Sequence, residues 1–146
     1  MTNKLSEDYI GACMSAKQTV QFLPEPPSEL QKRHVYIIKI CYDLSLRLKE
    51  VRVSDIAETI NGTLPSITKN IATLEKKGYL IKEKNSKDKR AINIKLSDKG
   101  LAIYQTKIYD FHKKNSALFK DIPEEDIHTT IKTIHEIYRL MEKEYM

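Results

Sequence analysis

The chain has 146 residues, of which 40% are hydrophobic and 31% charged, so it is long enough for one domain with a buried core. No apolar stretch approaches the ~20 residues that cross a bilayer, and residues 1–8 lack the apolar segment of a secretion signal, so we expect a soluble, cytoplasmic protein without a membrane partner. The net charge is +5, and residues 47–100 alone carry 13 Lys or Arg and 7 Asp or Glu, a surplus of six positive charges.

A basic block between near-neutral segments is typical of nucleic-acid-binding modules, because phosphates attract local positive charge. A lysine-rich solubilising surface is the alternative.

The N-terminal third is helical by pattern: apolar residues recur at spacings of three and four over residues 6–22, with Ser6 as the expected N-cap. Prolines between residues 24 and 27 interrupt the pattern, which returns over residues 29–48. The second helix is apolar on most faces near residues 35–41, so we expect it at the centre of the core.

Residues 54–77 have the pattern of a helix-turn-helix. Val51 and Val53, just before them, are candidates for a minor strand. Ser54 is the expected N-cap of a first short helix, which Asn61-Gly62 ends because both residues tolerate a positive φ. Thr63 can cap a second helix with apolar residues at i, i+4 and i+7, and its other faces carry short side chains that can reach base edges in a major groove. A helical hairpin with a polar surface is the alternative.

A predicted β-hairpin follows the second helix. Residues 79–84 and 91–96 are short alternating segments, and the six polar residues between them include three positive charges. A hairpin in this position is a wing, whose tip commonly enters a minor groove, where arginine is attracted by the negative potential. We expect Asp88 to brace Arg90 or a backbone amide. Ser97 is the expected N-cap of a helix that runs to about residue 120, and a last helix with an apolar stripe begins near Pro123.

Several of these segments resemble the multiple-antibiotic-resistance-regulator (MarR) family. They are Ser54–Ile60, Ile67-Thr68, Leu74–Leu80, Asp88–Arg90 and Leu96–Gly100. The resemblance implies a mainly α fold with a small β-hairpin wing, in which a winged helix-turn-helix is joined to a helical dimerisation region. The implied division is an N-terminal dimerisation helix and linker (1–34), a DNA-binding domain (35–97) and C-terminal dimerisation helices (98–146).

The resemblance also implies the function: a sequence-specific transcriptional regulator, expected to be a repressor, that binds a pseudo-palindromic site in double-stranded DNA as a homodimer. Its recognition helices would lie about 34 Å apart. A winged-helix scaffold that binds protein instead of DNA is the alternative. The expected DNA-binding residues are Ser54, Thr63, Ser66, Thr68, Lys69, Asn70, Thr73, Lys87, Asp88, Lys89 and Arg90.

The resemblance also implies an effector site for a small apolar or phenolic molecule, which aromatic and cysteine side chains could line. The alternative is that these side chains simply belong to the hydrophobic core. The candidates are Tyr9, Cys13, Tyr36, Cys41, Tyr42 and Tyr109. The two cysteines are buried thiols or, alternatively, oxidant sensors that would tune DNA release. The four histidines lack metal-ligand spacing, and no nucleophile or phosphate-loop motif occurs, so we expect no metal, no cofactor and no enzyme activity.

Overall fold

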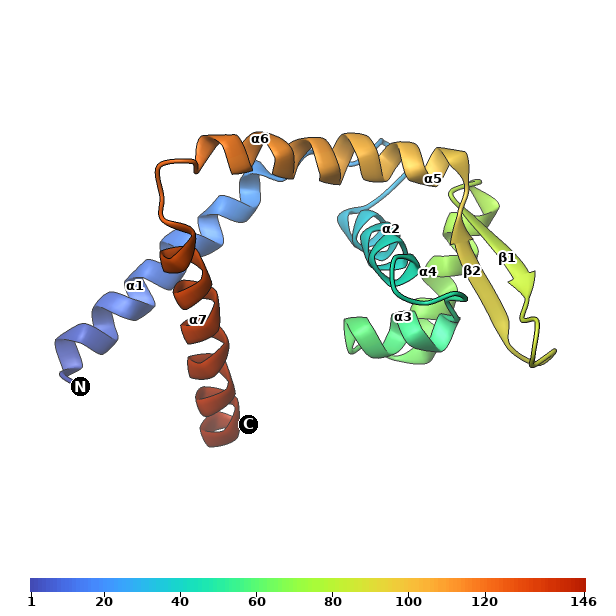
Figure 1. The fold of residues 1–146 in the computed structure, drawn as a ribbon. Coiled ribbons are helices and arrows are strands. Elements are labelled where there is room, and N and C mark those ends of the chain that lie inside the picture. Colours follow the sequence, from blue (N-terminus) through green and yellow to red (C-terminus); the bar gives the residue numbers. More distant parts are fainter. The chain divides into compact units, whose positions relative to one another are not determined.

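The structure is a computed structural model that describes all 146 residues, which form two compact units, residues 1–111 and residues 112–146. The elements of the first unit are α1 (Asn3–Thr19), the short 3-10 helix η1 (Val20–Phe22), α2 (Lys32–Ser45), α3 (Val53–Ile60), α4 (Leu64–Lys76), β1 (Leu80–Lys84), β2 (Ile92–Leu96), α5 (Asp98–Ile103) and the π-helix η2 (Tyr104–Tyr109). Helix α6 (Asp110–Leu118) crosses the division, and α7 (Glu124–Tyr145) lies in the second unit. The predicted fold class, mainly helical with a β-hairpin, is confirmed (Figure 1).

Helix α2 is the centre of the core of the first unit, as expected. Its side chains Ile37, Ile38, Cys41 and Leu44 are at most 2% exposed. The helix packs against α3, α4, β2 and the helical segment formed by α5 and η2. Full burial of each such aliphatic side chain contributes about 1.5–3 kcal/mol, so α2 is the main anchor for the elements around it.

The helix-turn-helix forms where the sequence predicts it. Asn61 ends α3 in the left-handed conformation, with φ of 56°, and Thr63 caps α4 by accepting a hydrogen bond from the backbone N–H of Ser66. A side chain at Gly62 would come within 3.3 Å of Ile67, so the turn is tightly packed there. The predicted apolar stripe of α4, Ile67, Ile71 and Leu74, is buried.

Two predicted N-caps are wrong. The cap of α3 is Arg52 instead of Ser54, because the Asp55 carboxylate accepts the Arg52 backbone N–H at 2.8 Å, and a charged acceptor in the first turn also favours the helix dipole. Ser54 therefore lies inside the helix. The cap of α1 is Thr2 instead of Ser6, because the Thr2 hydroxyl is correctly spaced to accept from the backbone N–H of Leu5 at 3.1 Å.

Strands β1 and β2 form the predicted wing as an antiparallel pair, with Leu80 opposite Leu96 and Lys84 opposite Ile92. The expected minor strand is a single bridge between Arg52 and Asn93, supported by a 2.7 Å hydrogen bond from the Ile94 N–H to the Val51 carbonyl. The hairpin is thereby joined to the segment that leads into α3 (Figure 1).

The helices at the two ends of the chain contain no buried residue. This holds for α1 and for α7, although α7 begins as expected, after Pro123 and with three acidic residues in its first turn. The long helix predicted from Ser97 onward begins there, but its middle turn is the π-helix η2. None of the helices combines the length and the apolar composition needed to span a membrane.

Candidate nucleic-acid interface

Helix α4 presents a polar face on the side opposite its buried stripe. Ser66, Thr68 and Lys69 are exposed on this face, and each is free of side-chain hydrogen bonds within the protein. Thr73 is half-buried, and its hydroxyl donates to the Lys69 carbonyl at 3.2 Å. The first three side chains are therefore available to an external partner, whereas the hydroxyl proton of Thr73 is used inside the helix.

Asn70 is engaged by a residue that the sequence analysis did not select. Its side-chain oxygen accepts a hydrogen bond of 3.1 Å from Nε of Arg33, at the start of α2. The guanidinium of Arg33 remains exposed beside the polar face of α4. Because the two residues are 37 positions apart, no local pattern could reveal this pair, and only the packing of α2 on α4 brings them together.

The wing loop presents three cationic side chains. Lys87, Lys89 and Arg90 are exposed, and the Arg90 side chain is 98% exposed. Asp88 accepts the Arg90 backbone N–H at 3.0 Å and lies 3.9 Å from its Nε. The expected bracing role of Asp88 is therefore present in the geometry, while Arg90 keeps most of its donors free.

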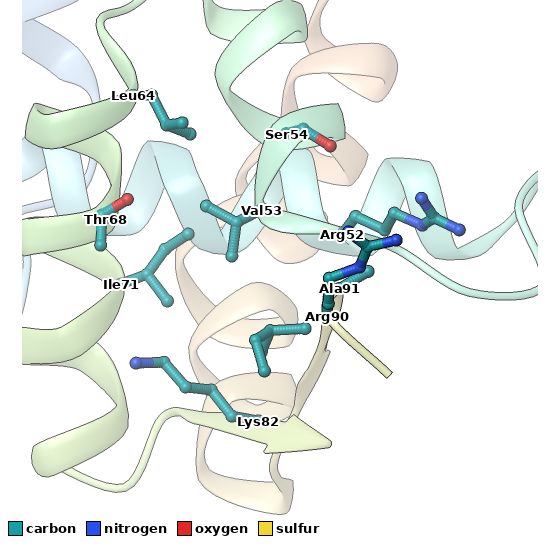
Figure 2. A pocket seen from close by; sticks show the side chains of 10 residues that line it. Arg52, Val53, Ser54, Leu64, Thr68, Ile71, Lys82, Arg90 and Ala91 are labelled. Carbon is teal, nitrogen blue, oxygen red and sulfur yellow. The ribbon is translucent and has the colours of Figure 1, made fainter. Parts of the chain in front are cut away.

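A pocket of about 360 Å³ lies between α4, the start of α3 and the wing. Its lining residues are Arg52, Val53, Ser54, Leu64, Thr68, Ile71, Lys82, Arg90, Ala91 and Ile92. In Figure 2, Leu64, Thr68 and Ile71 stand along one wall, and Arg52 and Arg90 lie at the far end. No acidic residue lines the pocket, although Lys82 and Arg90 pair with Glu75 and Asp88 and the Arg52 backbone N–H donates to Asp55. The pocket is therefore suited to a negatively charged group.

The pocket adds two residues to the predicted set, Arg52 and Lys82. Lys82 could have been considered from the sequence, because it is a cation in the first predicted strand of the wing. Arg52 was not predicted, because the N-cap was assigned to Ser54 and the helix was therefore expected to start two residues later. Of the predicted residues, Ser54 and Thr68 line the pocket with Arg90, whereas Thr63 is exposed and serves as the N-cap of α4.

The residues predicted for an effector site lie in different surroundings. Tyr42 stacks on Tyr104 with ring centroids 3.7 Å apart, so both rings are occupied in packing α2 on η2. Tyr36 and Tyr109 are about half exposed. Tyr9 is partly buried on α1, where its hydrogen bond with Cys13 raises the pKa of Tyr9.

The two cysteines differ in accessibility. Cys41 is 1% exposed, and burial raises the pKa of its thiol to about 12, so the reactive thiolate is suppressed near neutral pH. Cys13 is partly exposed and forms no disulfide. Of the two candidate oxidant sensors, only Cys13 has the access that such chemistry needs.

Comparison with known proteins agrees with this geometry. The family model described as "MarR family" matches residues 46–92, which run from the end of α2 to the start of β2. A search of curated protein sequences finds no significant match.

Solved structures match over nearly the whole chain. FabT of Streptococcus pneumoniae in complex with DNA is 17% identical with a TM-score of 0.67, and the match covers 97% of this chain and 99% of FabT. MepR of S. aureus in a DNA complex is 18% identical with a TM-score of 0.60, covering 97% and 99%. A MarR protein from Peptoclostridium difficile is 22% identical with a TM-score of 0.63, covering 98% and 90%. The family model thus matches the helix-turn-helix and the first part of the wing, and the solved structures share the fold of nearly the whole chain.

Proposed function

We propose that this chain is a DNA-binding transcriptional regulator that inserts α4 into a major groove and the wing into an adjacent minor groove. The observation that carries the proposal is the pocket between α4 and the wing, which is lined by Arg52, Lys82 and Arg90 and by no acidic residue. A surface that tracks a phosphate backbone needs local positive charge. The similar structures of FabT and MepR are complexes with DNA, which supports the same assignment.

The exposed polar face of α4 contacts the base edges. In a helix-turn-helix, the N-terminal half of the second helix contacts base edges, and Ser66, Thr68 and Lys69 occupy that half. Lys69 can donate to guanine, and the Thr68 methyl group can contact thymine. Asn70 and Thr73 lie at the edge of the contact, because Arg33 and the helix backbone already engage them.

The wing and the pocket supply backbone contacts. Arg90 is free enough to enter a minor groove, and Lys87 and Lys89 flank it on the exposed loop. Ser54 and Arg52, at the start of α3, can donate to a phosphate that enters the pocket beside α4 (Figure 2). Asp88 and Thr63 act from within the protein, by holding the loop and capping the helix.

A homodimer fits the remaining helices. The apolar stripe of α7 includes Ile127, Ile131, Ile134 and Met141, each 38–48% exposed, and no residue of α7 is buried. We propose that a second copy covers this stripe and that residues 1–34 and 98–146 form the dimerisation region. Two recognition helices about 34 Å apart would then read a pseudo-palindromic site, where bound protein would repress transcription. An apolar or phenolic effector, or oxidation at Cys13, would release it by favouring a different spacing of the helices.

The experiment is a fluorescence anisotropy titration of duplex DNA at two salt concentrations. We expect wild-type affinity to fall steeply with salt, and Arg90→Ala to weaken binding more than tenfold near physiological salt and to reduce the salt slope by about one. Arg139→Ala, which removes an exposed arginine from α7, is the matched control and should bind like wild type. Salt-independent or absent binding by the wild-type protein would reject DNA binding and favour a protein-binding scaffold.

A further inference from the structure

Two asparagines are buried at the base of the wing, although most of the loop is exposed. Asn85 follows β1 and is 4% exposed, and Asn93 lies in β2 and is 9% exposed. The Asn85 side-chain amide donates a hydrogen bond of 2.8 Å to the Asn93 side-chain oxygen. Burying two amides is costly unless they pair, so this contact is a specific feature of the hairpin and not incidental surface polarity.

The two side chains connect the loop to β2, and the backbone of β2 is in turn paired with the segment before α3. The Asn85 side-chain oxygen accepts the backbone N–H groups of Lys87 and Asp88, each at 3.0 Å. Asp88 then accepts the N–H of Arg90 at 3.0 Å. At the other end, the backbone of Asn93 lies opposite Arg52, the N-cap of α3, in a β-bridge beside the 2.7 Å hydrogen bond from the Ile94 N–H to the Val51 carbonyl. Backbone pairing therefore joins β2 to the segment before α3, and the side chains of Asn93, Asn85 and Asp88 extend this connection to the backbone of Arg90.

A second contact holds the loop from the side of α2. The Glu50 carboxylate, in the connection between α2 and α3, accepts the Ser86 N–H at 3.4 Å. Hydrogen bonds from Ser86 and Asn93 lower the pKa of Glu50 from its ordinary value. The carboxylate is therefore charged near neutral pH, and the loop is held on two sides while its lysines and arginine point outward.

We propose that Asn85 and Asn93 are positioning residues for DNA binding, which fix the basic wing loop relative to α3 and so hold Arg90 at the pocket edge. The effect on DNA binding rests on the proposed function. The ordering of the wing loop by the two asparagines concerns the free protein alone. An apolar residue at position 93 would suit a buried strand position equally well, so packing alone does not require the amide. What such a residue would remove is the acceptor for Asn85.

The first test uses Asn93→Leu, which keeps the approximate size of the side chain and removes that acceptor. Amide hydrogen exchange of the free protein should become at least tenfold faster at Lys87, Asp88 and Arg90, while the paired amides of β1 and β2 stay protected. Asn85→Ala should give the same pattern. Unchanged exchange in the loop would overturn the proposal, whether or not the protein binds DNA, and loss of protection throughout the hairpin would show a purely structural role.

The second test is a double-mutant cycle on DNA. Asn93→Leu should weaken duplex binding by about as much as Arg90→Ala, and the double variant should bind no more weakly than Arg90→Ala alone, because both changes remove one contact. Additive losses would overturn the positioning role. If the wild-type protein shows no salt-dependent binding, the proposed function fails while the hydrogen-exchange result still decides the role of the two asparagines.

Discussion

The helices around α2 and the helix α7 have apolar stripes of similar regularity, yet only the first set is covered. Ile56, Ile71 and Leu74 are fully buried in the winged helix, whereas Ile131 and Ile134 on α7 are 48% and 38% exposed. Periodicity in a sequence shows which face of a helix is apolar, but it does not show what covers that face. The contrast teaches that the apolar stripes around α2 bury one another, while the stripe of α7 is the surface that we propose a second copy covers.

The largest effect is expected from substitutions in the apolar stripe of α7, which should weaken the proposed dimer. In the double variant Ile131→Glu/Ile134→Glu, unpaired charges would enter the proposed dimer interface at a combined cost of roughly 3–6 kcal/mol, which raises the dimer dissociation constant by at least about a hundredfold. Sedimentation equilibrium should then show monomers at micromolar concentration. Lys132→Glu, one position off the stripe, is the control and should remain dimeric. A double variant that keeps its dimer mass would contradict the proposed interface.

A smaller effect is expected at Gly100, in the covered part of the molecule. A Cβ atom there would lie 2.3 Å from the backbone oxygen of Tyr79, so Gly100→Ala must displace α5 from the end of the wing. We expect the free energy of unfolding to fall by about 1–3 kcal/mol. Urea denaturation measures the change, and an unaltered midpoint would show that this contact is looser than the structure has it.

Gly11 is the matched position in the uncovered part. It lies within α1, and a Cβ atom there would meet nothing within 4 Å. Gly11→Ala should therefore raise the free energy of unfolding by roughly 0.5–1 kcal/mol, through helix propensity alone. The same denaturation experiment decides the sign. Destabilisation would mean that another chain approaches α1 closely at Gly11. It would thereby locate part of the dimer interface.

The smallest expected effect depends on pH. Nδ1 of His34 accepts the Gln31 N–H at the start of α2, and burial lowers the pKa of His34 below its ordinary value. The folded protein therefore binds this proton less readily than the unfolded chain, so its stability contribution is complete above about pH 6.5 and is lost as the pH falls through the folded pKa. Asn at this position keeps the acceptor without titrating. Melting temperatures of wild type and His34→Asn should thus converge or cross on acidification from pH 7 to pH 5, and parallel curves would contradict the assignment.

Local patterns in the sequence were sufficient for the helix-turn-helix and the wing. Thr63, Asn61 and the stripe of α4 are all defined by neighbours within a few positions, and the structure has them as predicted. Capping at Ser54 was predicted wrongly because two polar residues competed for one helix start, and the charged Asp55 acceptor selects Arg52 as the cap.

Features that depend on distant contacts could not be predicted. The Arg33 to Asn70 hydrogen bond and the Arg52 to Asn93 bridge each join residues far apart in the chain. The alternation of β2 likewise predicts one buried face, but Asn93 and Ile94 are both buried, because the segment before α3 covers the second face of the strand. The pocket follows from these contacts, so its full lining could be recognised only from the assembled fold.

The most direct test of the account is an NMR titration of isotope-labelled protein with a short DNA duplex. We predict that amide resonances of α4 (residues 64–76) and of residues 84–92 in the wing shift or broaden, because these segments form the proposed interface. Resonances of residues 124–145 in α7 should stay in place, because that helix is assigned to the dimer. Perturbations confined to α7, or none in α4 and the wing at saturating duplex, would contradict the account.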